Sequence, residues 1–108
     1  MTSVEFLNQG GRISGFCCKG HSGYGEAGTD IVCASVTTAV RVAEATIRDV
    51  LGVSCRVQVD EPTATIRLTL PASCEDAEEA VQAVLSGMML TLCDLRDEYP
   101  DYIEVLEV

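Results

Sequence analysis

Hydrophobic and polar residues alternate along two segments at the start of the chain, residues 2–8 and 12–19, with the sequence NQGG at 8–11 between them. A period of two is typical of a strand with one buried face, and a glycine-rich turn between two such runs indicates a β-hairpin. Gly15 shifts the alternation by one residue, which predicts a β-bulge. Such a bulge, just ahead of a glycine-rich loop, could help to aim His21; simple tolerance of a glycine is an equal alternative.

A longer segment, residues 30–51, repeats its apolar residues every three or four positions, which is typical of an amphipathic α-helix. Thr29 and Asp30 are both suitable N-cap residues, and Gly52 is typical of the position that follows a helix. The stripe predicted to face the core consists of Val32, Val36, Val40, Ala43, Ile47, Val50 and Leu51.

Two further alternating runs, residues 53–60 and 64–70, flank a turn at 61–63 and predict a second pair of antiparallel strands. The last run, residues 102–108, alternates again and predicts a short terminal strand.

A second helix is predicted between Pro71 and Tyr99. Ser73, with Asp76 three residues later, resembles a capping box at its start. The predicted apolar stripe of this helix consists of Ala77, Val81, Val84, Met88, Leu92 and Leu95.

The order ββαββαβ predicts an α+β fold in two layers, a mostly antiparallel sheet with two long helices packed on one face. A chain of 108 residues, 47% of them hydrophobic, suffices for one hydrophobic core. Residues 1–108 are therefore predicted to form a single domain.

The chain is strongly acidic, with a formal net charge of −10. This charge argues against nucleic acid or an anionic membrane as a direct partner and favours a basic one, although acidity that only confers solubility is the simpler explanation of the charge alone. The first residues, MTSVEFLNQGG, lack the features of an export signal, and no apolar run is long enough to span a membrane. We therefore expect a cytoplasmic protein whose six cysteines are free thiols.

The segment from 20 to 37 contains the chain's one histidine, His21, and Cys33. Four glycines between 20 and 28 predict a mobile loop, which ends where the first helix begins; they are Gly20, Gly23, Gly25 and Gly28. In the first turn of that helix, free backbone N–H groups and the helix dipole favour a thiolate and would offer donors to an oxyanion. Cys33 and His21 are therefore candidates for nucleophile and general base.

Other interpretations of these residues stay open. A single histidine in a loop is usually solvated, and a cysteine on a helix is usually a small core residue. Asp30 either caps the helix or orients the imidazole, and the cap is favoured. Cys74 also lies near a helix start, but no second histidine is left for it. The cysteines lack metal-ligand spacing and the glycines match no phosphate-binding loop, so we expect neither a metal nor a cofactor.

Gly20-His21, the glycine-rich loop and then GTDIVCA at 28–34 together resemble the signature of the ribosomal-processing cysteine proteases called Prp. The resemblance covers essentially the whole chain, including the acidic second helix and the ending Tyr-Pro-x-Tyr. It implies a homodimeric endopeptidase that removes the N-terminal extension of large-subunit ribosomal protein twenty-seven and cuts after paired aromatic residues.

The resemblance also implies roles for individual residues. His21 matches the catalytic base and Cys33 the nucleophile, while Gly20 and Asp30 match positions that build the site. Thr37 stands at a position where members often have a serine. Threonine keeps the hydroxyl group of serine and adds a methyl group.

A basic ribosomal protein would be attracted by the negative charge of such an enzyme. The glycine-rich loop would serve as a lid that closes over the bound peptide. The main alternative is a non-catalytic, ribosome-associated acidic module that binds a basic protein, with Cys33 merely buried. A weaker alternative is thiol redox sensing through Cys17 or Cys18.

Overall fold

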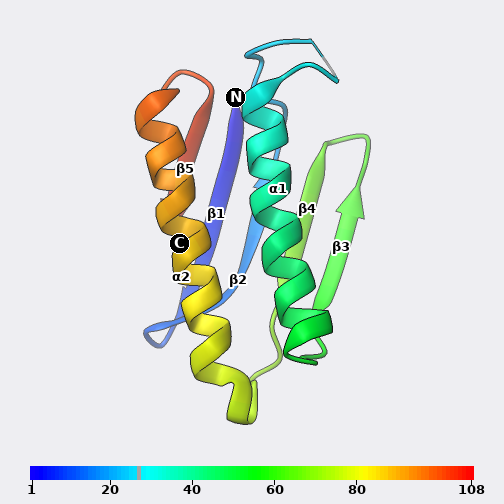
Figure 1. The fold of residues 1–108 in the computed structure, drawn as a ribbon, viewed down its shortest axis with the longest axis vertical. Helices are drawn as coiled ribbons and strands as arrows, with labels where there is room; N and C mark the ends of the chain where they lie inside the picture. Colours follow the sequence, from blue (N-terminus) through cyan, green and yellow to red (C-terminus); the bar gives the residue numbers. More distant parts are fainter. Residues whose placement is uncertain (27) are drawn as a thin grey trace.

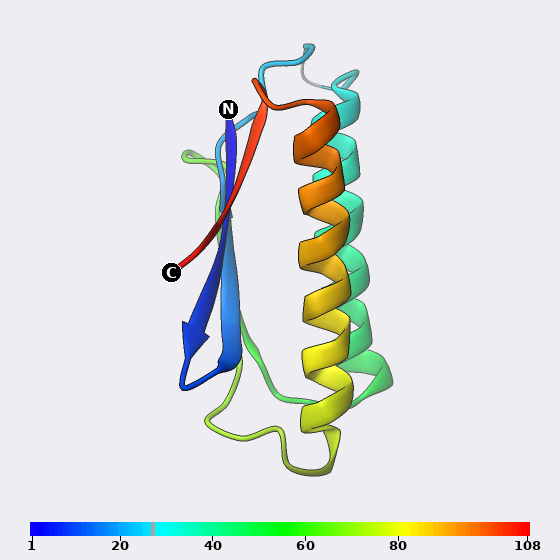
Figure 2. The ribbon, with the colours of Figure 1, turned by 90° about the vertical axis from the view of Figure 1, so that its left-hand side faces the viewer.

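The computed structural model describes residues 1–26 and 28–108. In chain order the elements are β1 (Thr2–Gln9), β2 (Arg12–Lys19), α1 (Ile31–Ala45), β3 (Arg56–Asp60), β4 (Thr65–Thr69), α2 (Glu78–Glu98) and β5 (Ile103–Glu107) (Figure 1). The strands form one sheet in the order β3-β4-β2-β1-β5. All neighbours are antiparallel except β1 and β5, which are parallel. Both helices lie on one face of the sheet, so the predicted α+β class and two-layer arrangement are confirmed (Figure 2).

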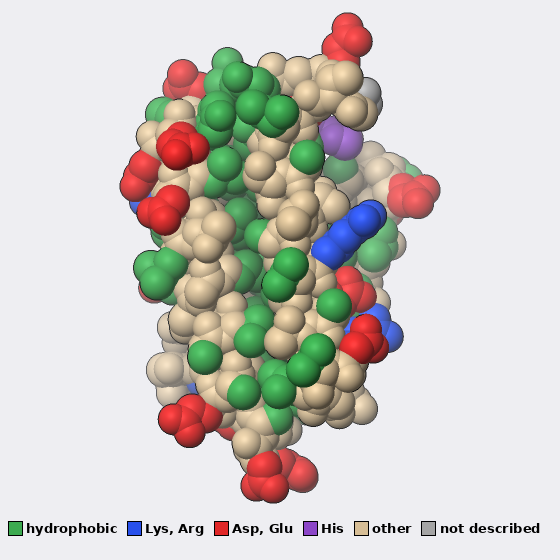
Figure 3. Space-filling model, viewed as in Figure 1, with side chains coloured by type: hydrophobic (Ala, Val, Ile, Leu, Met, Phe, Trp, Pro, Cys, Tyr) green, Lys and Arg blue, Asp and Glu red, His purple; other side chains and the backbone are tan. Residues whose placement is uncertain are grey.

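The hydrophobic core lies between the sheet and the helix layer. Phe6 and Phe16 face each other from β1 and β2, with ring centroids 6.3 Å apart. The other large, fully buried side chains include Leu68, Ile103, Ile47, Leu85 and Leu92. Between the two helices runs an apolar groove of about 750 Å³, lined by small residues such as Ala39 and Gly87 (Figure 3). No helix in the described part of the chain is long and apolar enough to cross a membrane.

The bulge predicted at Gly15 is confirmed. Leu7 pairs with Gly15 and Asn8 with Ile13, so Ser14 is an extra residue on β2. Glycine is needed here because a Cβ atom would overlap the Leu68 carbonyl oxygen on β4. The bulge lies roughly 17 Å along the strand from the loop that begins at residue 20, too far to aim His21.

The first helix ends differently from the prediction. A π-helical turn, η1 (Thr46–Val50), follows α1, and Gly52 adopts the expected left-handed conformation with φ +66°. Because this turn is wider than an α-helical one, residues at its end rotate away from the core face. Val50 is therefore 76% exposed and does not belong to the predicted stripe, whereas Val32, Val36, Val40, Ala43 and Ile47 are buried as predicted.

The strand predicted from residue 53 begins only at Arg56. The N–H of Val53 donates to the Ile47 carbonyl, and the N–H of Cys55 donates to the Val53 carbonyl. These backbone groups therefore close the helix end instead of pairing with β4.

The capping box predicted at Ser73 and Asp76 is wrong. The Ser73 hydroxyl accepts a hydrogen bond from the N–H of Glu75, the first residue of a short 3₁₀ turn, η2 (Glu75–Ala77). The carboxylate that accepts the Cys74 N–H is Glu78, at 3.2 Å. Glu78 can do so because α2 begins one turn later than the capping-box spacing assumes.

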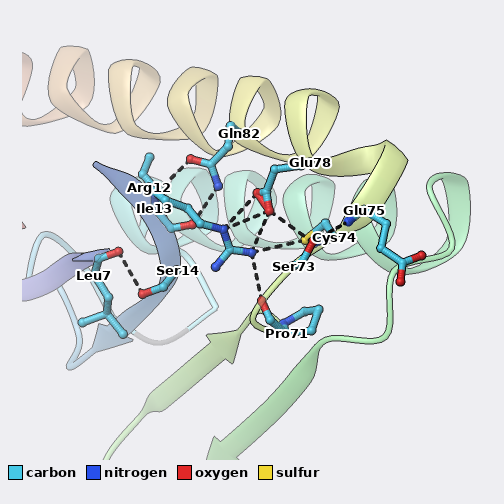
Figure 4. Close-up of polar contacts among 10 residues, drawn as sticks. All are labelled: Leu7, Arg12, Ile13, Ser14, Pro71, Ser73, Cys74, Glu75, Glu78 and Gln82. Atoms are coloured by element: carbon cyan, nitrogen blue, oxygen red, sulfur yellow. Dashed lines mark hydrogen bonds and ion pairs between the residues drawn. The ribbon is translucent and has the colours of Figure 1, made fainter. Parts of the chain in front are cut away.

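Glu78 also ties the second helix to the sheet (Figure 4). The Arg12 guanidinium on β2 donates to both Glu78 oxygens at 2.9 Å, which holds the pKa of Glu78 below its ordinary value. One turn further along α2, the Gln82 amide exchanges hydrogen bonds of 2.9 and 2.8 Å with the Ile13 backbone. Helix α2 therefore faces the core through Val81, Leu85, Met88 and Leu92. Leu85 was missing from the predicted stripe, and Ala77, Val84 and Leu95 are only partly buried.

Replacing Gly15 with alanine is expected to destabilise the protein by about 1–3 kcal/mol, because the added Cβ atom would push β2 away from β4. Gly87 in α2 is the matched control, since a Cβ atom there meets no described atom within 4 Å. Gly87→Ala should instead stabilise the protein by about 0.5–1 kcal/mol. Urea unfolding followed by circular dichroism measures both variants, and a fully stable Gly15→Ala variant would contradict the close strand approach.

Candidate active site

Residues 20–26 and 28–30 lie between the end of β2 and the start of α1, at one end of the molecule, and form the described part of the loop (Figure 1). It begins at Gly20, whose φ of +86° favours glycine. A Cβ atom at Gly20 would also lie 2.8 Å from the Met1 carbonyl oxygen. The N–H of Gly20 donates to the Ala64 carbonyl at 3.1 Å. The backbone just before His21 is therefore fixed between β1 and the start of β4.

Asp30 caps α1, as favoured by the sequence. One carboxylate oxygen accepts the Cys33 N–H at 2.9 Å. The other accepts the Ser22 hydroxyl at 2.5 Å and the Gly25 N–H at 3.1 Å. These donors hold the pKa of the buried Asp30 well below its ordinary value, with the Ser22 hydroxyl as the strongest contributor. Among the described residues no hydrogen bond joins Asp30 to His21, so the orienting role has no support.

The Cys33 side chain is half-buried and contacts Ser22 twice. The Ser22 N–H donates to the sulfur at 3.3 Å, and the thiol lies 3.5 Å from the Ser22 hydroxyl oxygen, to which it donates. Sequence reasoning missed Ser22. The sequence offered one signal for Ser22: it is a hydroxyl residue directly after the one histidine, on a loop that leads to the capping Asp30.

Two of the backbone donors that were predicted to serve an oxyanion are already used within the first turn of α1. The Cys33 N–H is taken by the Asp30 carboxylate, and the Ala34 N–H donates to the Asp30 carbonyl at 3.0 Å. The negative carboxylate also occupies the positive end of the helix dipole. The donor directed at the sulfur comes from the loop instead, as the N–H of Ser22.

His21 lies on the exposed side of the same loop (Figure 3). Its carbonyl carbon is bonded to the Ser22 nitrogen that contacts the sulfur, so its Cα atom is within about 6 Å of the Cys33 sulfur. No hydrogen bond joins the imidazole to the thiol within residues 1–26 and 28–108. The side chains nevertheless line the same two pockets, and catalytic hydrogen bonds often tighten only when substrate binds.

His21 and Cys33 both line two pockets. One, of about 310 Å³, lies between α1 and the ends of β2 and β4; the other, of about 700 Å³, faces the glycine loop. Both are also lined by Thr37 and Arg41, which follow Cys33 at one-turn intervals on α1. Thr37 is exposed, and its hydroxyl makes no hydrogen bond in the part of the chain that is described. Sequence reasoning missed Arg41, which the i, i+4, i+8 spacing from Cys33 could have indicated.

The glycines predicted to make the loop flexible line the larger pocket. Gly23 and Gly28 have φ values of +77° and +88°, which favour glycine, while Gly25 uses its N–H to bind Asp30. The loop also rests on the turn before β5, because the Tyr24 ring packs edge-on against Tyr99 and Tyr102 at 5.2 and 5.1 Å. Its mobility stays a prediction.

The other cysteines are free thiols, as expected. Burial raises the pKa of Cys18 to about 12, and it also raises the pKa values of Cys55 and Cys74. Within the described ranges, no group of three or more His, Cys, Asp or Glu side chains could hold a metal ion.

A thiol at the start of a helix, with a histidine beside it, in a two-layer α+β fold, defines a candidate thiol hydrolase. Residues 1–104 match the family described as cysteine protease Prp. This chain therefore belongs to the Prp family and is a cysteine protease.

Individual relatives agree with this assignment. The chain is 28% identical over 94 residues to the ribosomal processing cysteine protease Prp of Bacillus subtilis, covering 86% of this chain and 84% of that protein. Its fold matches the essential ribosomal processing protease Prp of S. aureus, solved with a covalently linked product peptide, with a TM-score of 0.88 and 22% identity over the whole of both chains. It also matches a Streptococcus mutans protein with a TM-score of 0.87 and 24% identity, over all of this chain and 94% of that one.

The ionised Asp30 side chain should make stability depend on pH. Its pKa is lowered in the folded protein, so its contribution is complete above the unfolded-chain value of roughly 3.9 and is lost as the pH falls toward the folded value. Asparagine keeps a capping oxygen but no charge. The free energy of unfolding of Asp30→Asn should therefore lie below that of the wild type at about pH 7, and the gap should shrink below about pH 4.

Urea unfolding at several pH values measures this gap. Asp94→Asn, which removes an exposed carboxylate on α2, is the control for the same change in net charge. A gap for Asp30→Asn that stays constant into acid would contradict the role of the charge.

Proposed function

We propose that this protein is an endopeptidase that removes the N-terminal extension of large-subunit ribosomal protein twenty-seven, cutting after paired aromatic residues. Cys33 is the nucleophile and His21 the general base. The observation that carries this proposal is the contact of 3.3 Å between the Ser22 N–H and the Cys33 sulfur, because it brings the residue next to His21 against the thiol. Membership of the Prp family supports the same chemistry.

In the first half of the reaction, the His21 imidazole takes the thiol proton and the Cys33 sulfur attacks the carbonyl carbon of the scissile peptide bond. The carbonyl oxygen becomes an oxyanion, for which the Ser22 N–H is the nearby donor. The C–N bond then breaks, the amine leaves with the proton from His21, and a thioester joins the extension to Cys33.

In the second half, a water molecule gives a proton to His21 and attacks the thioester carbon. The C–S bond breaks, the sulfur recovers the proton, and the extension leaves with a new carboxylate. Gly20 and Asp30 build this site by fixing the two ends of the loop, and Thr37 lines both pockets.

The remaining parts of the proposal concern the loop and the surroundings of the enzyme. The described loop residues, 20–26 and 28–30, act as a lid over bound peptide, with Gly23, Gly25 and Gly28 as its flexible positions. The net charge of −10 attracts a basic ribosomal protein and disfavours nucleic acid. We place the enzyme in the cytoplasm as a homodimer, which follows from the resemblance to Prp proteases.

Replacing Cys33 with alanine should abolish cleavage of a peptide whose extension ends in two aromatic residues, and His21→Ala should slow it by about 10²–10⁴-fold. Mass spectrometry of the products measures cleavage, and thermal unfolding checks that each variant is folded. Cys93→Ala is the matched control, because Cys93 is another half-buried helical cysteine, on α2. Full activity of Cys33→Ala would refute the proposed nucleophile.

Cleavage of the full precursor should also depend on salt. An acidic enzyme attracts a basic substrate at long range, and dissolved ions screen that attraction. We expect kcat/KM for the precursor to fall by about tenfold between about 50 mM and 500 mM NaCl. A short uncharged peptide with the same cleavage site is the control and should change little. Equal salt dependence of the two substrates would contradict steering by charge.

A further inference from the structure

The three tyrosines of the chain meet in one cluster at the loop of the candidate active site. Tyr24 belongs to the loop, whereas Tyr99 and Tyr102 lie in the turn between α2 and β5. The ring centroid of Tyr24 lies 5.2 Å from that of Tyr99 and 5.1 Å from that of Tyr102, with interplanar angles of 85° and 79°. Aromatic rings attract each other in this edge-to-face geometry, because the positive edge of one ring meets the negative face of the other. The cluster therefore joins the loop to a segment near the other end of the chain.

The two partner rings are held by the rest of the fold. The Tyr99 N–H donates to the Leu95 carbonyl of α2 at 2.9 Å, and the Tyr102 N–H donates to the Tyr99 carbonyl at 3.0 Å. The Tyr102 carbonyl in turn accepts the Thr2 N–H of β1 at 2.9 Å. Both side chains also pack against the hydrophobic core. Tyr24, by contrast, is 43% exposed on the loop, so in this contact the fold positions the loop.

We propose that Tyr24 is a positioning residue for Cys33. Its ring anchors the loop on Tyr99 and Tyr102, and this anchor keeps the Ser22 N–H at the sulfur. The inference rests on the proposed function for the role of Cys33 as the nucleophile. Tyr24 itself acts through Ser22, because its own contacts are with the two tyrosines and with the Ser22 hydroxyl group.

A short connection carries the effect of the anchor to the sulfur. Only Gly23 separates Tyr24 from Ser22, and the Tyr24 N–H donates to the Ser22 hydroxyl oxygen at 3.2 Å. The position of the Tyr24 backbone therefore limits the position of Ser22. Ser22 is 2% exposed, and its own N–H donates to the Cys33 sulfur at 3.3 Å. Release of the Tyr24 ring would leave the hydrogen bonds to Asp30 to hold this segment.

The ring of Tyr24, and not its hydroxyl group, makes the anchoring contacts. Within residues 1–26 and 28–108, the Tyr24 hydroxyl forms no hydrogen bond. Phenylalanine keeps the ring and its charge distribution, so Tyr24→Phe should preserve the anchor. Alanine removes the ring and leaves the backbone, so Tyr24→Ala should release the loop without changing Ser22, Asp30 or Cys33 themselves.

The test measures hydrogen exchange of the Ser22 amide by NMR, because this is the N–H that contacts the sulfur. Local opening of the loop exposes the amide to water, so its exchange rate reports how often the contact is broken. Loss of both ring contacts in Tyr24→Ala should speed this exchange at least about fivefold, whereas Tyr24→Phe should exchange at the wild-type rate. Leu90→Ala is the matched control, because Leu90 is another exposed apolar side chain, on α2 and outside the tyrosine cluster.

Two further measurements keep the test decisive. Tyr99→Ala removes one partner ring and should also speed the exchange, and adding it to Tyr24→Ala should cause no further increase, because the two rings share one contact. The chain has no tryptophan and all three tyrosines lie in the cluster, so the near-ultraviolet circular dichroism of tyrosine reports the anchor directly. This signal should weaken in Tyr24→Ala by more than the share of one ring, with the far-ultraviolet spectrum retained. If Tyr99→Ala does not fold, Tyr24→Ala decides the test.

A wild-type exchange rate in Tyr24→Ala, or equally fast exchange in Tyr24→Phe and Tyr24→Ala, would overturn the inference. Peptide cleavage is measured separately on the same proteins, and kcat of Tyr24→Ala should fall at least about fivefold with a smaller change in KM. An unchanged kcat beside faster exchange would overturn the positioning role. Absence of cleavage by the wild type, with the exchange results as expected, would reject the proposed substrate and leave the anchor established.

Discussion

The buried carboxylate of Asp30 is the interaction on which the geometry of the site depends. It begins α1 by accepting the Cys33 N–H, and it fixes the loop by accepting the Ser22 hydroxyl and the Gly25 N–H. Because His21 precedes Ser22 in the chain, the same group sets the spacing between histidine and cysteine. A buried charge is tolerated only when it is fully hydrogen-bonded, so the loop and the helix must form together.

This arrangement has a consequence for the sulfur. The start of a helix attracts one negative charge most strongly, and here Asp30 takes that position. The hydrogen bond that reaches the Cys33 sulfur therefore comes from outside the helix, from the Ser22 N–H at 3.3 Å. Helix α1 fixes the position of the Cys33 sulfur, and the loop supplies the Ser22 N–H that contacts it.

Much of this could be predicted from sequence, because periodicity reports which face of an element is buried. The strand pairs, the bulge at Gly15 and the cap at Asp30 each follow from local chemistry. Features that depend on distant segments could not be predicted in this way. Ser22 matters only because the loop folds back on Asp30, and the Glu78 cap at the start of α2 depends on Arg12 from the opposite end of the chain. The spacing of the apolar residues does not reveal the π-helical turn at the end of α1, so Val50 was wrongly predicted to face the core.

The loop that carries His21 and the elements that line the smaller pocket beside Cys33 are held in place in different ways. His21 and Ser22 lie on a loop whose path needs left-handed glycines, so their positions depend on a few hydrogen bonds to one carboxylate. The apolar lining of the smaller pocket comes from the paired strands β2 and β4 and from α1, whose side chains are fixed by sheet register and core packing. Substitutions in the loop would directly disturb the contact with the sulfur, because the loop backbone itself makes that contact through the Ser22 N–H.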